Sequence, residues 1–126
     1  MIESTTEAGC TVLRLNRPDK ANALTGDMLD GLRQAVAGST AKVLILTGAG
    51  RVFSAGADLD GMRAGLGSSP LWEGLSGAIA AFPGLTIAAL NGTLAGGALG
   101  MALACDLRLS VPSAQFFYPV MRLGYL

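Results

Sequence analysis

Residues 86–106 (TIAALNGTLAGGALGMALACD) constrain the fold of this chain more than any other stretch. Residues 86–90 are apolar and predict a buried strand, which Asn91-Gly92 ends because both residue types tolerate positive φ. The pair Gly96-Gly97 then leads into residues 98–104, whose small and unbranched side chains predict a buried helix. A strand, a glycine corner and a helix therefore follow one another directly.

The glycine corner is a candidate site for a negative charge. The first turn of a helix carries unpaired backbone N–H groups and a partial positive charge. Glycine lets a ligand approach these groups closely because it has no Cβ. The ligand could be a phosphate or a developing oxyanion. The same pattern is as typical of a helix that needs glycine only for tight packing, and this stretch alone does not decide between the two.

The rest of the chain alternates strands and helices. The expected strands cover residues 7–16, 42–47 and 107–111, and the expected helices cover residues 25–37 and 70–82. Thr25 and Ser69 are the predicted N-caps, and Pro83-Gly84 ends the second helix. The Gly- and Ser-rich loop over residues 61–69 is expected to be mobile. This order predicts an α/β domain with right-handed crossovers, for which a doubly wound sheet is one possible arrangement.

Composition excludes several classes of function. The chain has 126 residues, enough for one domain, and 51% of them are hydrophobic, which favours a well-buried core. The formal net charge is zero, so nothing favours binding to nucleic acid or to an anionic membrane. The start, MIESTTEAG, lacks the features of a signal peptide. The only cysteines, Cys10 and Cys105, are interpreted as reduced thiols of a cytoplasmic protein, with Cys105 structural.

Three common kinds of site do not fit the residues. The chain has no histidine, so it cannot by itself supply a Ser-His-Asp or Cys-His site or most zinc sites. Gly48-Ala49-Gly50 follows a strand, but Phe53 stands where a dinucleotide-binding fingerprint needs its third glycine. Gly92 and Gly97 have the spacing of a phosphate-binding loop, but Ala98-Leu99 replaces its Lys and Ser/Thr.

A set of short motifs, each weak alone, occurs in a consistent order along nearly the whole chain. The motifs are Asn16-Arg17-Pro18 with Asn22-Ala23-Leu24, Leu46-Thr47-Gly48, Phe53-Ser54-Ala55-Gly56-Ala57-Asp58, Ala89-Leu90-Asn91-Gly92, Ala95-Gly96-Gly97, Cys105-Asp106-Leu107-Arg108 and Ala114-Gln115-Phe116. In this order and at this spacing, they resemble the crotonase (enoyl-CoA hydratase/isomerase) superfamily.

The resemblance implies a fold and an assembly. The fold would be an α/β spiral of ββα units with two roughly perpendicular sheets. Because family members are about twice this length, we expect residues 1–126 to be the N-terminal spiral domain, incomplete at the C-terminus. The resemblance also implies a homotrimer or a dimer of trimers.

The resemblance further implies a binding site for a coenzyme A thioester, with no permanently bound cofactor and no metal. The backbone N–H groups of Ala57 and Gly97 would form an oxyanion hole, because preorganised donors stabilise an enolate or tetrahedral oxyanion. The implied substrate-binding residues are Ala55, Ala57, Asp58, Leu59, Asp60, Gly96 and Gly97. Asp58 could equally cap a short helix that starts at Leu59.

Arg17 and Lys20 are candidates for contacts with the coenzyme A phosphates. As charged residues of a polar loop, they could as well be only solvated.

The chain departs from the resembled family at the catalytic acids. Hydratases of the family place glutamates at the positions of Gly100 and Val120 here, and neither residue can carry a proton. Addition of water to a conjugated double bond needs such carboxylates. Tyr118, Tyr125 and Asp60 remain as candidate proton donors.

The sequence therefore predicts an acyl-CoA-binding protein similar to enoyl-CoA hydratases and isomerases, acting as a lyase or an isomerase. The alternatives are a non-catalytic acyl-CoA binder or carrier, and a decarboxylase or thioester hydrolase.

Overall fold

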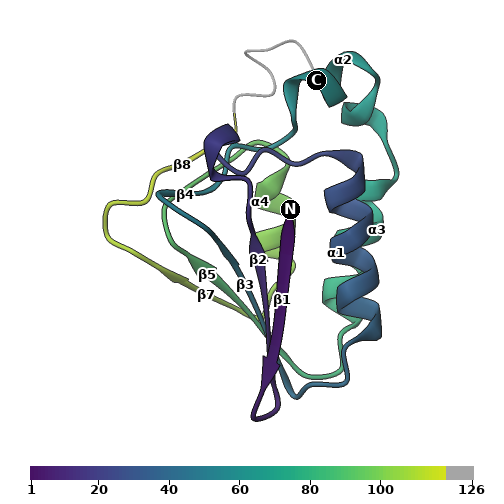
Figure 1. Ribbon diagram of the computed structural model, residues 1–126, viewed down its shortest axis with the longest axis vertical. Helices are drawn as coiled ribbons and strands as arrows, with labels where there is room; N and C mark the ends of the chain where they lie inside the picture. Colours follow the sequence, from purple (N-terminus) through teal and green to yellow (C-terminus); the bar gives the residue numbers. More distant parts are fainter. Residues whose placement is uncertain (119–126) are drawn as a thin grey trace.

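The computed structural model describes residues 1–118 and contains two β-sheets (Figure 1). The larger sheet has the order β1 (Ile2–Glu7), β2 (Cys10–Leu15), β3 (Val43–Gly48), β5 (Leu85–Leu90) and β7 (Leu107–Ser110). The smaller sheet has the order β4 (Val52–Ser54), β6 (Thr93–Ala95) and β8 (Phe116–Phe117). The helices are α1 (Gly26–Gly38), α2 (Leu59–Arg63), α3 (Leu71–Ala81) and α4 (Ala98–Leu103), with 3-10 turns η1 (Pro18–Lys20) and η2 (Leu66–Ser68).

The chain winds as a repeated spiral in which each turn adds one strand to each sheet. Strands β3 and β4 are followed by α2 and α3, strands β5 and β6 by α4, and strands β7 and β8 end the described part. Strands β2, β3, β5 and β7 are parallel neighbours in chain order, as are β4, β6 and β8. The expected spiral of ββα units is confirmed. The doubly wound alternative is wrong, because that arrangement reverses its strand order partway across the sheet.

The first predicted strand is in fact two. Residues 7–16 were expected to form one strand, but β1 and β2 pair as an antiparallel hairpin in which Glu7 faces Cys10. The two loop residues, Ala8 and Gly9, both have positive φ, at 52° and 80°. Two-residue hairpin turns favour this conformation because it matches the twist of the strands. Strand β1 was not predicted because it is polar and five of its six residues are exposed, so it shows no alternation of apolar side chains.

The core lies between the larger sheet and the pair α1 and α3, which pack side by side along one side of it (Figure 1). Strands β2, β3 and β5 each bury alternate residues, as period-two side-chain placement requires. Each of the two helices buries one apolar face against the sheet, with Leu75 and Ile79 buried on α3. The buried residues of α1 are Met28, Leu29, Leu32 and Val36.

The predicted cap of α1 is confirmed, whereas α3 starts one residue later than predicted, with Pro70 directly before it and Ser69 still bonded to its first residue. Thr25 Oγ1 accepts from the Met28 N–H at 3.1 Å, and Ser69 Oγ accepts from the Leu71 N–H at 3.2 Å. The loop over residues 61–69 is more structured than expected, because it contains the end of α2 and all of η2. Within residues 1–118, no helix is both long enough and apolar enough to cross a membrane.

The Asn91-Gly92 turn forms for a reason different from the one the sequence suggested. Neither residue has positive φ. A Cβ on Gly92 would lie 1.8 Å from the Arg51 carbonyl oxygen, so glycine is needed for backbone approach. The Asn91 side chain accepts from the Gly48 N–H at 3.0 Å and donates to the Gly50 and Val52 carbonyls. The turn therefore ties the end of β5 to the loop between β3 and β4.

Helix α4 is also less buried than expected. It covers six residues, and Ala98, Met101 and Ala102 are buried while Gly100 and Leu103 are exposed. The exposed side of α4 leaves room for a cavity.

Candidate functional site

The two glycine corners of the chain meet in space. Gly56 and Gly96 both have positive φ, at 98° and 60°. A Cβ on Gly56 would lie 3.0 Å from the Ala95 carbonyl oxygen and 3.5 Å from the Gly97 nitrogen. The backbones of the two corners are thus in direct contact, which any side chain at Gly56 would obstruct.

This contact brings together the two predicted oxyanion donors, Ala57 and Gly97. Among residues 1–118, neither N–H has a hydrogen-bond acceptor, although the Gly56 N–H next to Ala57 donates to Ser54 Oγ at 3.1 Å. Backbone N–H groups away from water are nearly always paired. Both residues are partly exposed and line the same cavity, so a ligand there could accept from both.

The cavity has a volume of about 600 Å³. One wall is formed by α3 and the residue that caps it, and the opposite wall by the start and exposed side of α4. The described lining residues are Ala57, Met62, Gly67, Ser68, Ser69, Trp72, Glu73, Ser76, Gly97, Leu99, Gly100, Leu103 and Tyr118. Of these, Glu73 carries a carboxyl group and Tyr118 a phenolic hydroxyl.

The segment that carries Ala57 is held by the buried side chain of Asn22. Asn22 Oδ1 accepts from the Arg17 N–H at 2.8 Å, and its Nδ2 donates to the carbonyls of Ala49 and Val52 at 2.9 and 2.8 Å. Ser54 Oγ in turn donates to the Asn22 carbonyl at 2.9 Å. Asparagine fits this position because it supplies one acceptor and two donors and tolerates the observed φ of 53°.

Leu24 then fixes the peptides on either side of Ala57. The Leu24 N–H donates to the Gly56 carbonyl at 2.7 Å, and the Asp58 N–H donates to the Leu24 carbonyl at 2.8 Å. Leu24 is fully buried, so this short bridge is anchored in the core. The motif Asn22-Ala23-Leu24 therefore holds the backbone around Ala57, although it lies more than thirty residues earlier in the chain.

Asp58 has the capping role that was one of its two predicted roles. Its Oδ2 accepts from the Gly61 N–H at 3.0 Å at the start of α2. Its Oδ1 pairs with Arg17 Nη1 at 2.9 Å, and the same guanidinium donates to the Ala23 carbonyl at 3.0 Å. The hydrogen bond from Arg17, supported by that from Gly61, holds the pKa of the Asp58 carboxyl below its usual range. The carboxylate is therefore ionised and engaged at neutral pH.

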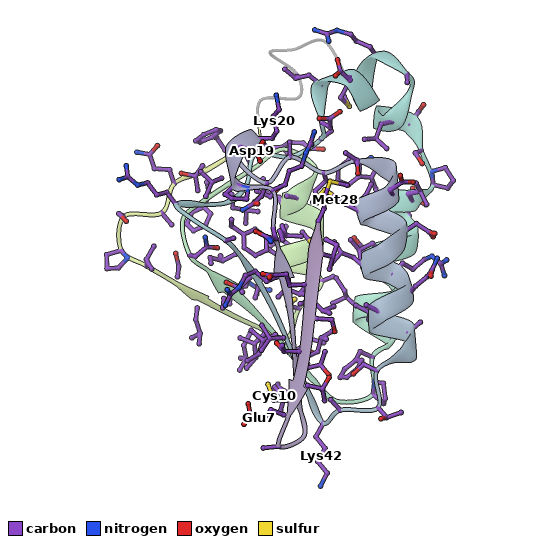
Figure 2. The ribbon with its side chains drawn as sticks, viewed as in Figure 1. Glu7, Cys10, Asp19, Lys20, Met28 and Lys42 are labelled. Carbon is purple, nitrogen blue, oxygen red and sulfur yellow. The ribbon has the colours of Figure 1, made fainter. Side chains whose placement is uncertain are left out.

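The other predicted contacts lie outside the cavity wall. Leu59 and Asp60 are exposed on α2, and Asp60 pairs with Arg63 at 2.7 Å. Lys20 is exposed at the end of η1 beside Asp19, at the opposite end of the molecule from Glu7 and Lys42 (Figure 2). Ala55 and Gly96 flank the two donors, with a Cβ on Gly96 lying 3.7 Å from the Ala55 carbonyl oxygen.

The first turn of α4 faces α3 across the cavity. A Cβ on Gly97 would lie 2.9–3.1 Å from three carbons of the Trp72 ring. A Cβ on Gly100 would lie 3.6 Å from Ser76 Oγ, so a hydroxyl group borders the position at which hydratases of the family carry a glutamate. The second such position, Val120, and the candidate donor Tyr125 lie outside the described residues.

The segment that follows α4 is hydrogen-bonded to β5. The Thr86 N–H donates to Asp106 Oδ2 at 2.9 Å, and the Asp106 N–H donates back to Thr86 Oγ1 at 2.8 Å. Arg108 Nη1 donates to the Cys105 carbonyl at 2.9 Å and, over longer distances of 3.3 and 3.4 Å, to the Ala102 and Leu103 carbonyls of the last turn of α4. Cys105 is a buried free thiol, as predicted, and burial raises its pKa to about 11.

Sequence reasoning missed the contribution of α3 to the site. Ser69, Trp72, Glu73 and Ser76 recur at the spacing i, i+3, i+4, i+7, which places them on one face of a helix. That face lies beside the core stripe, so its polar residues read as a solvated surface. Among residues 1–118, no group of three or more His, Cys, Asp and Glu side chains gathers to hold a metal ion.

Comparisons with known proteins identify the family of this chain. The family model described as "Enoyl-CoA hydratase/isomerase" matches residues 5–126. The "Probable enoyl-CoA hydratase echA6" of Mycobacterium leprae is 35% identical over 98% of this chain and 53% of its own length. "4-Chlorobenzoyl coenzyme A dehalogenase-1" of an Arthrobacter species is 33% identical over 92% of this chain and 47% of its own length.

A solved structure shows the same fold. The crystal structure of an enoyl-CoA hydratase from Mycobacterium avium subsp. paratuberculosis superposes with a TM-score of 0.88 at 33% identity, over 98% of this chain and 52% of that one. The chain thus spans about half the length of the relatives it matches. Since the family model covers nearly every residue and the spiral fold agrees, this chain belongs to the enoyl-CoA hydratase/isomerase, or crotonase, family.

Proposed function

We propose that this chain forms the acyl-CoA-binding part of a crotonase-family enzyme and holds the substrate's thioester carbonyl at the N–H groups of Ala57 and Gly97. The observation that carries the proposal is the meeting of both groups in one cavity, with no acceptor among residues 1–118. A thioester carbonyl gains negative charge as it becomes an enolate or a tetrahedral intermediate. Backbone donors already in place stabilise that charge without reorganising.

The names of the relatives support a coenzyme A thioester as the substrate, because one is named for an enoyl-CoA and another for 4-chlorobenzoyl coenzyme A. We propose that no permanently bound cofactor takes part. The remaining contacts, along the pantetheine, would come from Ala55, Asp58, Leu59, Asp60 and Gly96. Lys20 would meet the phosphates of coenzyme A. Arg17 would meet them only if it can do so while paired with Asp58.

The reaction class we propose is that of a hydratase or isomerase, with hydration of crotonyl-CoA slow beside ordinary hydratases. Gly100 lines the cavity without a carboxylate, which is the reason for expecting slow hydration. The same observation favours a second candidate, a non-catalytic acyl-CoA binder or carrier. A decarboxylase or thioester hydrolase would use the same pair of donors.

We propose a homotrimer or dimer of trimers in the cytoplasm, without a nucleic-acid or membrane partner. An exposed apolar set on β7 and β8 supports an assembly, because another part of the protein or another subunit would cover it. Its members are Leu107, Leu109, Phe116 and Phe117, each 49–63% exposed.

The test of the thioester site uses the full-length protein and crotonyl-CoA labelled with ¹³C at the carbonyl. Binding is measured by calorimetry, and polarisation of the bound carbonyl by the infrared shift of its stretching band. We expect binding with a shift to lower frequency. Absence of binding to crotonyl-CoA and butyryl-CoA would reject the proposed site, whereas binding without turnover would favour the carrier.

A matched pair of variants isolates the Gly97 donor. Gly97 has φ −60°, which proline can adopt, so Gly97→Pro removes the N–H without forcing the backbone. Alanine at the same position keeps the N–H. Both changes are made with Trp72→Leu, because any Cβ at Gly97 would meet the Trp72 ring. We expect the proline variant to show a smaller carbonyl shift and about 100-fold less turnover than the alanine variant.

A further inference from the structure

We propose that Glu73 is the general base that removes a proton from Cα of the bound acyl group, and the acid that returns it. This inference rests on the thioester site proposed above. Among the described residues that line the cavity, Glu73 is the only carboxylate. It shares this cavity with both N–H groups assigned to the oxyanion.

The face of α3 that carries Glu73 is directed at α4. Trp72, Glu73 and Ser76 all line the cavity and lie on one face of α3, and Ser69 lines it from just before the helix. The buried Leu75 belongs to the neighbouring stripe, which packs into the core. The position of Glu73 is therefore set by the packing of a helix and does not depend on a loop.

Two contacts locate the turn of α3 that contains Glu73. The Trp72 ring would meet a Cβ on Gly97 at 2.9–3.1 Å, and Ser76 Oγ would meet a Cβ on Gly100 at 3.6 Å. Trp72 directly precedes Glu73, and Ser76 follows it by almost one helical turn. The carboxylate thus projects from a turn that lies against the first turn of α4, and the two glycines leave that wall open.

The Glu73 carboxylate is also not engaged by another side chain of the described residues. Among residues 1–118 it has no hydrogen-bond or ion-pair partner, whereas Asp30, Asp58 and Asp60 each hold an arginine. A general base must be able to reach its proton and must not be neutralised by a fixed cation. Of the acids described in this chain, Glu73 alone meets both conditions at the cavity.

The proposed step is a reversible enolisation. The Cα–H bond breaks and its proton moves to the Glu73 carboxylate. The bonding pair forms a Cα=C double bond, and the carbonyl π pair moves onto the oxygen, where the Ala57 and Gly97 N–H groups stabilise it. Return of the proton to Cα restores the thioester, so no co-reactant is required.

Hydrogen exchange measures this step without any assumption about the overall reaction. The full-length protein is incubated with butyryl-CoA in D₂O, and incorporation of deuterium at Cα is followed by mass spectrometry. We expect the protein to catalyse exchange, and Glu73→Gln to lower the rate at least about 100-fold. The control is Glu7→Gln, a matched change at the end of β1 beside Cys10 and outside the cavity, which is expected to exchange at the wild-type rate (Figure 2).

Rescue and rival variants complete the test. Formate should restore part of the exchange in Glu73→Ala, because a small carboxylate can occupy the space of the missing one. Tyr118→Phe and Asp60→Asn test the rival proton donors, and neither should lower the exchange rate as far as Glu73→Gln does. The inference is overturned if Glu73→Gln exchanges like wild type, if Tyr118→Phe or Asp60→Asn abolishes exchange instead, or if wild type binds butyryl-CoA without exchanging it. Failure to bind any acyl-CoA would reject the thioester site itself.

Discussion

A Cβ atom on Gly97 would lie 2.9 Å from Cζ3 of Trp72, a ring that is itself held by a 2.8 Å hydrogen bond from Nε1 to the Leu66 carbonyl. The indole therefore closes the space beside the first turn of α4. Glycine at this position serves the packing of α3 against α4 as well as access to the N–H group.

This relationship makes Gly97→Ala a costly change. We expect it to lower the free energy of unfolding by about 1–3 kcal/mol, because the Trp72 ring must shift from a well-packed position. The same change in a Trp72→Leu background should cost much less, since the shorter side chain leaves room for the methyl group. Chemical denaturation of the four proteins in this cycle measures the coupling. Equal costs in both backgrounds would contradict the contact.

Gly92→Ala should be more severe, with a loss of at least about 3 kcal/mol. The added Cβ would lie 1.8 Å from the Arg51 carbonyl oxygen, and no side-chain rotation can relieve an overlap with backbone. The matched control is Gly77→Ala on α3, where a Cβ meets nothing within 4 Å. That control should gain about 0.5–1 kcal/mol, because alanine is the better helix former. Thermal unfolding that ranks the two variants the other way would refute this assignment.

Asn22 should tolerate neither Ala nor Asp. Asn22→Ala leaves the Ala49 carbonyl without its side-chain donor, the Arg17 N–H without its acceptor, and the Val52 carbonyl with only the 3.2 Å bond from Asn91. We expect a loss of about 2–3 kcal/mol. Asn22→Asp should be worse, since it directs a carboxylate oxygen at two carbonyls. The control is Asn16→Ala, an exposed asparagine, for which we expect less than about 0.5 kcal/mol. Denaturation titrations compare the three variants, and a near-neutral Asn22→Ala would show that this network is not needed for stability.

Stability should depend on acid through Asp58. Because Arg17 lowers the pKa of Asp58 in the folded state, the unfolded chain binds this proton more readily. The contribution of Asp58 is therefore complete above the ordinary carboxyl pKa and is lost as the pH falls through the folded pKa. The free-energy difference between wild type and Asp58→Asn should be largest at pH 7 and shrink below about pH 4. Arg17→Gln should reduce that difference, and a difference that is constant with pH would contradict the ion pair.

The two thiols should differ in reactivity. Burial raises the pKa of Cys105 to about 11, so the thiolate that attacks alkylating agents is scarce at pH 8. Cys10 is partly exposed at the start of β2. Mass spectrometry after brief iodoacetamide treatment should find label on Cys10, with Cys105 labelled only after unfolding. Comparable labelling of both in the native protein would show that Cys105 is accessible.

Local patterns in the sequence were sufficient for the elements that depend on neighbouring residues. The stripe of α1 and its Thr25 cap follow from spacings within one or two helical turns, and the structure has both. The family resemblance implied that Ala57 and Gly97 act as a pair of donors; both residues line one cavity, and their role as donors stays a prediction. Strands β4, β6 and β8 were not predicted, because each has only two or three residues, too few to show a period of two.

Only the tertiary structure decided the features that join distant residues. Nothing local distinguishes Gly92 as a point of contact with Arg51, or Asn22 as the buried link between the loops that follow η1 and β3. In the same way, the pattern of α3 shows Glu73 only as an exposed helix residue, and its place at the rim of the cavity depends on α4 lying beside α3. Hydrophobic periodicity records which face of an element is buried, whereas close approach, hydrogen bonding and a shared cavity depend on which elements become neighbours, and long-range packing determines that.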